Sequence, residues 1–489
     1  MRFVLLDRSQ METIHLASLD VLENAGVTFL SERARRIFRE AGATVDSKNK
    51  NVKISPSLIK EALRKCPSKF NLYARNPKYN LEIGADSQYM TCGGEYPYIL
   101  DLETGARRLA LAKDTESITR LVDALENISV GGSYVVFPSD LPEPIVHIER
   151  SVLHYRQTSK TIHWDSEGYV GKSGELGATH NLELAATIAG GIDELTRKPI
   201  GTVSICPSSP LIYDVGLTDD VIEFVRHGVP VLIEPMDNTG ATSPITLAGT
   251  LVQTTASVLA GMVLVQLVKA GNPVVYGGIP VNTDMRTGIP AVGCPETALS
   301  CAGGAAMAEY YGLPSAMSGG VSDSKIPDIQ AGLESALTML TTVLAGANWI
   351  RVVAGALEYH FTASFEMLVI HDEMFGMAKR IAHGIDVNED TLATALIKRV
   401  APIGGHYMAE KHTLDHINSE RFVPKLCDKR TRGDWEKTGS KDLAKVANER
   451  AKEILATHDP DPLPKDIEKE LEAKKKEIEK RLLRATASA

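Results

Sequence analysis

Short apolar runs rich in β-branched residues recur through the middle of the chain, from about residue 126 to residue 400. Stretches rich in Ala, Leu and Glu, which favour helix, separate these runs, and successive runs begin about 30 to 45 residues apart. That spacing is typical of one strand–helix unit with its loops. The predicted strands are Gly132–Phe137, Thr161–Trp164, Ile200–Ile205, Pro230–Ile233, Pro273–Tyr276, Pro314–Met317 and Trp349–Val353.

Seven such units without a glycine-rich nucleotide fingerprint favour a TIM (β/α)8 barrel, in the α/β class, over an open doubly wound sheet. The pattern leaves two candidates for the eighth strand. One is Leu357–Phe361, and the other is a strand from the region before residue 126. In that region, Tyr89–Cys92 and Tyr98–Leu102 flank Gly93 and Gly94, which predicts a hairpin or a paired loop.

The two ends of the chain carry different patterns. We expect residues 1–125 to form an N-terminal α+β extension, 126–400 the catalytic barrel, and 401–489 a C-terminal helical extension with a charged tail. From Asp466 to Arg484, apolar residues recur at roughly helical spacing among Lys and Glu. This pattern favours a solvated helix that lies on its own domain. The alternative is a helix that docks a partner or a second copy in a homodimer.

Composition and charge exclude several classes of protein. The 489 residues are 43% hydrophobic and 24% charged, which is typical of a globular chain. With 53 basic and 62 acidic residues, the net charge of −9 disfavours binding to nucleic acid or to an anionic membrane. The N-terminus lacks the apolar stretch of a signal peptide, and the longest uncharged apolar run, Ala256–Val265, is shorter than a membrane span. We therefore expect a cytoplasmic protein with reduced cysteines.

Several cofactor motifs are missing from the sequence. No two glycines stand two positions apart, and neither a P-loop nor an H-E-x-x-H motif occurs. No histidine follows an Asp at the spacing found in cobalamin-carrying domains, so we expect this chain to bind no corrinoid of its own. His412 and His416 stand at positions i and i+4. Because no third ligand lies nearby in the sequence, we expect them to be structural or surface residues and expect no metal site.

A series of loop segments follows the predicted strand ends and continues outside them. The segments are Glu234–Gly249, Gly277–Pro280, Ser318–Lys325 and Asp328–Glu334, together with Ala41–Asp46, Gly355–Glu358, Ser364–Glu366 and Gly405–His406. In this order they resemble the trimethylamine methyltransferase family, the amine:corrinoid methyltransferases, over roughly residues 10 to 440. The resemblance implies a TIM barrel that transfers a methyl group from an amine nitrogen to the Co(I) centre of a separate corrinoid protein. The cob(I)alamin would therefore be supplied by that partner.

One departure from the family narrows the expected substrate. The family's namesake carries pyrrolysine in the barrel, whereas this chain consists of ordinary residues throughout. It is similar to the non-pyrrolysine branch, which is associated with quaternary amines such as glycine betaine, proline betaine and carnitine. A quaternary nitrogen leaves as a neutral tertiary amine without needing a proton, which fits a chain without the special residue. Glycine betaine, as in a glycine betaine:corrinoid methyltransferase, is the first expectation.

The candidate site residues lie at predicted strand ends and in the adjoining loops, where TIM barrels concentrate their chemistry. A trimethylammonium group calls for aromatic faces and a carboxylate, and a betaine carboxylate calls for Arg, His or N–H donors. We expect Glu234 and His163 to be catalytic. The residues expected to bind the substrate are Tyr96, Phe137, Trp164, Tyr276, Arg351 and His360.

Several of these residues have a second interpretation. Glu234 lies either near the substrate cation or in a buried ion pair, and Arg351 either binds the substrate carboxylate or pairs with a barrel acid. Phe137 and Tyr276 are explained equally well as core residues. For Trp164, beside His163 at a strand end, a site role is favoured.

Two other functions stay open. A zinc-dependent methyltransferase of the methanol or thiol type is also a barrel, although the His-x-Cys ligand spacing is missing from this chain. An inactive protein that binds betaine or docks the corrinoid protein would have the same composition. Metal analysis separates the first alternative from the leading one, and an assay of demethylation separates the second.

Overall fold

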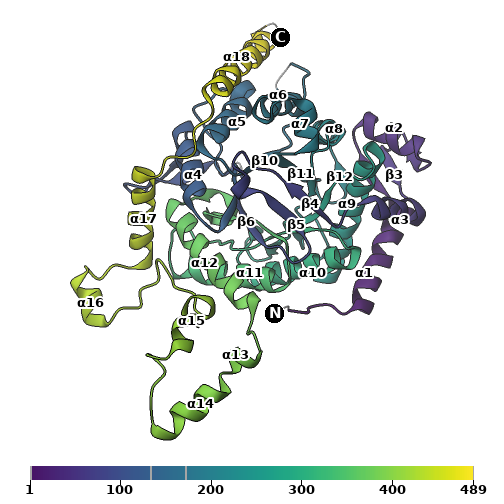
Figure 1. Ribbon diagram of the computed structural model, residues 1–489. Helices are drawn as coiled ribbons and strands as arrows, with labels where there is room; N and C mark the ends of the chain where they lie inside the picture. Colours follow the sequence, from purple (N-terminus) through teal and green to yellow (C-terminus); the bar gives the residue numbers. More distant parts are fainter. Residues whose placement is uncertain (1–2, 133–134, 171–172, 488–489) are drawn as a thin grey trace.

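A closed parallel barrel of eight strands forms the centre of the molecule, with the spatial order β10-β11-β13-β15-β18-β19-β6-β9 (Figure 1). The structure is a computed structural model that describes residues 3–132, 135–170 and 173–487. The predicted TIM-barrel fold is confirmed. In chain order the barrel strands are β6 (Tyr89–Cys92), β9 (Ile128–Gly132), β10 (Thr161–Asp165), β11 (Gly201–Ile205), β13 (Val231–Ile233), β15 (Val274–Gly278), β18 (Ser315–Ser318) and β19 (Trp349–Ala354).

Six of the seven predicted strands coincide with barrel strands to within two residues at each end. The exception is the predicted strand Gly132–Phe137, because the observed strand β9 ends at Gly132. Residues 133 and 134 of that prediction lie outside the described residues, and Val136 forms only an isolated bridge with Tyr96. Pairing with β6 and β10 on its two sides decides where β9 lies, and this overrides the stronger local β-propensity of the following residues.

The eighth strand comes from the region before residue 126, which was one of the two candidates. It is β6, and it pairs with β19 and β9 to close the barrel. The prediction that it forms a hairpin with Tyr98–Leu102 is wrong, because β7 (Tyr98–Leu100) pairs instead with β8 (Arg107–Leu109) and β21 (Thr362–Ala363). The domain boundaries at residues 125 and 400 stay predictions, and the barrel takes its first strand from before the first boundary.

A ring of helices surrounds the barrel (Figure 1). Asp214, Asp328 and Ser364 cap three of these helices by accepting a hydrogen bond from a backbone N–H of the first turn. The ring helices are α4 (Ala112–Ala124), α5 (Val146–Gln157), α6 (Gly177–Ala189), α8 (Val215–Arg226), α9 (Leu247–Val268), α10 (Pro295–Tyr311), α11 (Ile329–Leu344) and α12 (Phe365–His383), with the short α7 (Ile192–Arg197) after α6.

Helix α9 is long and apolar enough, by length and composition, to cross a membrane. However, 78% of its most apolar window is buried inside the protein. It packs against the strands β13 and β15 on one side and against α1 (Arg8–Asp20) and α3 (Pro56–Lys65) on the other. A helix that is apolar on all sides is expected wherever it is enclosed by a large core, so this packing explains the composition of α9.

The N-terminal extension attaches to the barrel through a small sheet with the order β12-β1-β3-β2. Strand β12 belongs to a barrel loop and pairs in parallel with β1, and the rings of Phe29 and Tyr213 stack there with centroids 4.5 Å apart. The extension comprises β1 (Val27–Phe29), α2 (Glu32–Glu40), β2 (Thr44–Asp46) and β3 (Asn51–Lys53), with α1 and α3, and β12 is Ile212–Tyr213.

A hairpin closes the amino-terminal end of the barrel. Its strands are β4 (Lys69–Leu72) and β5 (Leu81–Gly84). Three of its apolar residues pack against inward side chains of the barrel strands and form a separate buried cluster. The cluster consists of Leu72, Leu81, Ile83, Val130, Leu232, Val275, Ala316 and Trp349. Access to the barrel interior is therefore from the carboxyl-terminal end.

The C-terminal helices divide into two sets. Helix α17 (Leu443–Thr457) packs on α12 and α4, and α18 (Lys465–Ala487) packs on α5 and α6. The side chains of Leu471, Ile478 and Leu482 in α18 are fully buried, so the expected helix lying on its own domain is confirmed. The second set extends away from the barrel (Figure 1) and consists of α13 (Glu389–Leu392), α14 (Thr394–Val400), α15 (Lys411–Glu420) and α16 (Arg432–Lys437).

Candidate active site at the carboxyl end of the barrel

The inner wall of the barrel changes from apolar to polar towards its carboxyl-terminal end. Side chains alternate along a strand, so the residue two positions beyond an inward residue also faces the lumen. On four strands this second residue is polar, charged or glycine. The pairs are Leu232 and Glu234, Val275 and Gly277, Ala316 and Ser318, and Trp349 and Arg351. The carboxyl-terminal end is where TIM barrels carry their chemistry.

An ion pair spans this polar layer. Arg351 Nε lies 2.8 Å from Glu234 Oε1, and the two side chains are 6% and 0% exposed. The strands β13 and β19 are separated in the ring by β15 and β18, so the pair crosses the lumen. The sequence left open whether each residue meets the substrate or an opposite charge of the barrel. In the structure they meet each other.

His163 belongs to the same layer. Its Nδ1 lies 2.7 Å from Thr202 Oγ1 and its Nε2 lies 3.2 Å from Ser204 Oγ. Arg351 Nη2 donates a long hydrogen bond, 3.5 Å, to the same Ser204 hydroxyl. The structure thus brings both residues expected to be catalytic, His163 and Glu234, together with Arg351. Both ring nitrogens of His163 are engaged, and its Nε2 shares the Ser204 hydroxyl with Arg351.

A glycine makes room for the carboxylate. A Cβ at Gly277 on β15 would lie 2.4 Å from Glu234 Cγ, closer than real side chains approach each other. Any larger residue at this position would displace Glu234 from the ion pair. The absence of a side chain at Gly277 therefore leaves the space that Glu234 occupies.

A cavity of about 470 Å³ opens at the carboxyl-terminal mouth. Its walls come from the loops that follow β11, β13, β15 and β19. Tyr359, His360 and Phe361 contribute three consecutive rings to one wall, and Met236 and Val281 lie among the other lining residues. An aromatic wall of this kind suits a cation that has no N–H to donate.

The turn that carries these rings has an unusual backbone. Glu358, Tyr359 and His360 have φ angles of +50°, +44° and +76°. Left-handed conformations cost on the order of 1–3 kcal/mol for residues with a side chain and persist only where the surroundings enforce them. Here the backbone N–H groups of Glu358 and Tyr359 donate to the carbonyls of Ser324 and Ser322 at 2.9 and 3.2 Å. The loop after β18 therefore fixes the rings at the mouth.

His360 lines the cavity and also packs against Tyr96. Its ring stacks on Tyr96, with centroids 6.2 Å apart and planes 14° apart. Burial lowers the pKa of His360 to about 4, so the ring is neutral at pH 7 and does not repel a cation. Burial also raises the pKa of the Tyr96 hydroxyl. The Tyr96 hydroxyl donates to the Gly93 carbonyl at 2.7 Å.

Trp164 and Tyr276 point away from the lumen. The Trp164 ring stacks on Phe224 of α8 with centroids 5.7 Å apart, in space that Gly201 leaves free. The Tyr276 hydroxyl lies 2.8 Å from Thr255 Oγ1 of α9. Both rings therefore fill the layer between strands and helices, and their positions favour packing over contact with a substrate.

Phe137 lies at the rim of the mouth. It is 38% exposed, and its backbone N–H donates to the Tyr96 carbonyl at 3.0 Å. The guanidinium of Arg150 lies 5.5 Å from the centre of its ring. Phe137 is thus near the candidate site without lining the cavity wall that carries Tyr359.

Several residues that shape the mouth were missed in the sequence. The buried carboxylate of Asp237 accepts hydrogen bonds from Gln253 Nε2 at 2.6 Å and Thr254 Oγ1 at 2.5 Å, which ties the loop after β13 to α9. Glu334 Oε2 accepts from Ser322 Oγ at 2.7 Å and from the Asp323 N–H at 2.8 Å. Asp237 and Glu334 lie in the loop segments that resemble the family, and this resemblance was the sequence feature that could have identified them.

Comparisons with known proteins identify the family of this chain. The family model described as Trimethylamine methyltransferase (MTTB) matches residues 1–481. The chain is 38% identical to "Trimethylamine methyltransferase MttB" of Desulfitobacterium hafniense (strain DSM 10664 / DCB-2), over 94% of this chain and 90% of that protein. It is 33% identical to "Glycine betaine methyltransferase" of Desulfitobacterium hafniense (strain Y51), over 96% of each chain.

A solved structure shares the fold. It is the crystal structure of the Methanosarcina barkeri monomethylamine methyltransferase (MtmB), with a TM-score of 0.56 and 13% sequence identity. The similarity covers 93% of this chain and 88% of that one. At this level of identity the likeness concerns the fold alone.

Proposed function

Since this chain belongs to the trimethylamine methyltransferase family and is a methyltransferase, we propose that it transfers a methyl group from a quaternary amine to a corrinoid protein. Glycine betaine is the preferred substrate of the proposal, with proline betaine and carnitine as related candidates, and the acceptor is the Co(I) of the separate protein. The observation that carries the choice of substrate is the Glu234–Arg351 pair beside the aromatic mouth. The proposal places the chain in the cytoplasm.

The ion pair matches a zwitterion. A betaine that enters between the two side chains presents its ammonium to Glu234 and its carboxylate to Arg351. Each buried charge then keeps an opposite charge beside it, which avoids the cost of leaving a buried charge unpaired. The guanidinium is suited to this exchange because its planar fork binds a carboxylate through two hydrogen bonds.

Trimethylamine fits this pair less well. It has no carboxylate, so Arg351 would lose its partner without gaining another when the amine approaches Glu234. A tertiary amine also has to be activated before it leaves, whereas a quaternary nitrogen already carries its positive charge. These two differences favour a betaine even though the chain is more identical to a trimethylamine methyltransferase than to a glycine betaine methyltransferase.

The rings at the mouth supply the second half of the recognition. Tyr359, His360 and Phe361 lie where a trimethylammonium group would enter, and cation–π attraction contributes about 0.5–2 kcal/mol per ring, depending on exposure. The low pKa of His360, about 4, keeps that ring neutral over the physiological range. The wall therefore attracts a permanent cation at any pH above about 5.

The chemical step needs little from the protein beyond orientation. The N–CH₃ bond breaks, its electron pair stays on nitrogen as a neutral tertiary amine, and Co(I) supplies the electron pair for the new Co–C bond. No proton is transferred, so neither Glu234 nor His163 has to act as an acid or a base. Glu234 and Arg351 hold the substrate with one methyl towards the mouth, and His163 positions Arg351 through Ser204.

A direct assay tests the proposal. The purified full-length chain is mixed with a corrinoid protein reduced to Co(I) and, in separate reactions, with glycine betaine, proline betaine, carnitine and trimethylamine. We expect methyl-Co(III) absorbance and an equal amount of the demethylated amine with at least one betaine. No methyl-Co(III) with any quaternary amine would overturn the proposal, and turnover of trimethylamine alone would do so as well. Binding of betaine without demethylation would identify the inactive binding protein instead.

The zinc-dependent alternative makes a different prediction. A metal site needs at least three His, Cys, Asp or Glu side chains whose ligand atoms lie close together. Among the residues that the structure describes there is one such group, which includes Asp390 and lies outside the barrel. The donor set of the described lumen therefore does not fit a catalytic zinc site. Activity that disappears on treatment with a chelator and returns with zinc, also in the variant Asp390→Asn, would favour the alternative.

Substitutions of Trp164 test whether this ring packs behind the barrel wall or contacts the substrate. We expect Trp164→Ala to lower the free energy of unfolding by about 3–5 kcal/mol, because it empties a buried space beside Phe224. The milder Trp164→Phe should leave KM for betaine within about twofold of the original value, because the ring does not face the lumen. Tyr359→Ala is the matched comparison, with KM raised about tenfold by loss of a cation–π contact. A larger rise in KM for Trp164→Phe than for Tyr359→Ala would contradict the outward placement of Trp164.

A further inference from the structure

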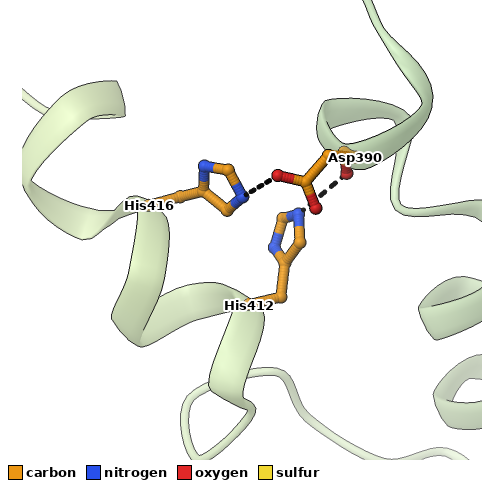
Figure 2. Close-up of side chains that lie close together, drawn as sticks. All are labelled: Asp390, His412 and His416. Carbon is orange, nitrogen blue, oxygen red and sulfur yellow. Dashed lines mark hydrogen bonds and ion pairs between the residues drawn. The ribbon is translucent and has the colours of Figure 1, made fainter.

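A second cluster of ligand-type side chains lies outside the barrel, between α13 and α15 (Figure 2). His416 Nε2 lies 3.1 Å from Asp390 Oδ2, and His412 Nε2 lies 3.2 Å from the Asp390 backbone carbonyl. The two imidazole rings are 4.3 Å apart on one face of α15. One ligand atom from each of the three residues lies within 4.8 Å of the others. The third ligand that the sequence did not supply near the two histidines is therefore Asp390, from another helix.

The segment that carries this cluster has almost no apolar core. It leaves the barrel after α12 and returns at residue 423, and all of its residues, 384–423, are described. Val400 is its one buried apolar side chain, whereas Ile385, Ile403 and Met408 are each more than four-fifths exposed. Segments of about 40 residues or fewer usually need a disulfide, a metal ion or a partner to keep a defined shape. Hydrophobic burial therefore does not explain why α13 and α15 lie together.

We propose that Asp390, His412 and His416 bind one divalent transition-metal ion, of which Zn²⁺ fits best, and that the ion holds α13 against α15. Two imidazoles and a carboxylate suit zinc, copper and nickel, and zinc takes such sets with tetrahedral geometry and no redox chemistry. A water molecule completes the coordination. The role is structural, since the site lies outside the barrel that carries the methyl transfer.

The distances allow an ion with small adjustments. Zinc binds imidazole nitrogen and carboxylate oxygen at about 2.0–2.2 Å, which places neighbouring ligand atoms about 3.3 Å apart. The pair His416 Nε2 and Asp390 Oδ2, 3.1 Å apart, already lies close to this separation, and the ligand atom of His412 lies within 4.8 Å of the other two. A neutral imidazole with its proton on Nδ1 presents the Nε2 lone pair to a metal, so the present hydrogen bonds are replaced without introducing a charge on the rings.

Zinc binding by the full-length chain tests this site. After removal of metals with a chelator, equilibrium dialysis against Zn²⁺ is expected to give one bound ion per chain. The double variant His412→Ala/His416→Ala, and separately Asp390→Asn, should weaken binding by about tenfold or more. His383→Ala is the matched control, because His383 forms an exposed ion pair with Asp386 at the base of the same segment and has no second histidine beside it.

Hydrogen exchange provides a second readout that does not depend on enzyme activity. If the ion holds α15 in place, the α15 amides should exchange about 100-fold more slowly at a zinc concentration 100 times Kd. The slowing should vanish in the double variant and persist in His383→Ala. No zinc bound by the unaltered chain, or binding that the double variant retains within twofold, would overturn the proposal. Methyl transfer is measured separately. A chain that binds no zinc can still be a methyltransferase, and a chain without methyltransferase activity can still bind zinc at this site.

Discussion

Replacing Arg351 by methionine is expected to lower the free energy of unfolding by about 3–5 kcal/mol, because it leaves the Glu234 carboxylate buried without its partner. The Glu234 side chain is fully buried and the ion pair crosses the barrel lumen. Methionine has a similar length to the aliphatic part of arginine, so the loss reflects the uncompensated charge more than an empty space. Urea unfolding of the full-length chain, with the midpoint and slope compared, measures the change.

A double-mutant cycle isolates the interaction. In Glu234→Gln/Arg351→Met neither residue carries a charge, and we expect this variant to be more stable than Arg351→Met alone, with a coupling energy of about 1–3 kcal/mol. A matched surface pair, Glu103 and Lys452 at 2.7 Å, should show a coupling below about 1 kcal/mol because it is exposed to solvent. If the changes in unfolding free energy of the two single variants simply add up in the double variant, the ion pair does not stabilise the barrel.

Glu234→Gln is expected to lower kcat/KM for glycine betaine by about 10²- to 10³-fold. The carboxylate is the charge of the lumen that faces the substrate cation in the proposed function, and removal of one partner of a buried charge pair costs about 2–5 kcal/mol. The variant keeps the shape of the side chain and its fit against Gly277. Steady-state formation of methyl-Co(III) at several betaine concentrations separates kcat from KM.

Two controls make the activity result specific. Glu103→Gln removes an exposed carboxylate outside the lumen and should leave kcat/KM unchanged. Tetramethylammonium, which has no carboxylate for Arg351 and is therefore expected to react more slowly than glycine betaine, should lose activity in Glu234→Gln but show little change in Arg351→Lys. Glycine betaine should lose activity in both variants. Full activity of Glu234→Gln would remove Glu234 from the site and require another group to receive the cation.

Much of the barrel was predictable because short stretches of sequence show the hydrophobic pattern of each strand. Apolar runs at intervals of one strand–helix unit located six strands, since a buried parallel strand needs continuous apolar residues on both faces. The prediction placed β9 too late in the sequence, and it gave β6 as only one of two candidates for the eighth barrel strand. Both strands are short and contain or adjoin glycine, so their positions are decided by pairing with neighbours that come from distant parts of the chain.

The sequence predicted the strand ends that carry the candidate site residues, but not the direction in which their side chains point. His163 and Trp164 are adjacent on one strand, so at most one of them faces the lumen, and packing selects His163. The same alternation turns Tyr276 outwards, because it pairs in register with Ile233, which packs against α9. Aromatic residues at strand ends predict which end of the barrel carries the candidate site, but the strand register decides which of them face the lumen.

The sequence by itself determined the class of fold and the family, because periodicity and ordered motifs are properties of short stretches of chain. It also predicted the end of the barrel that carries the candidate site. Only the tertiary structure decided that Glu234 meets Arg351, and that Asp390 meets His412 and His416. These contacts join residues from separate strands or helices. Their distances depend on how the barrel closes and how the helices pack, and no local spacing encodes that closure.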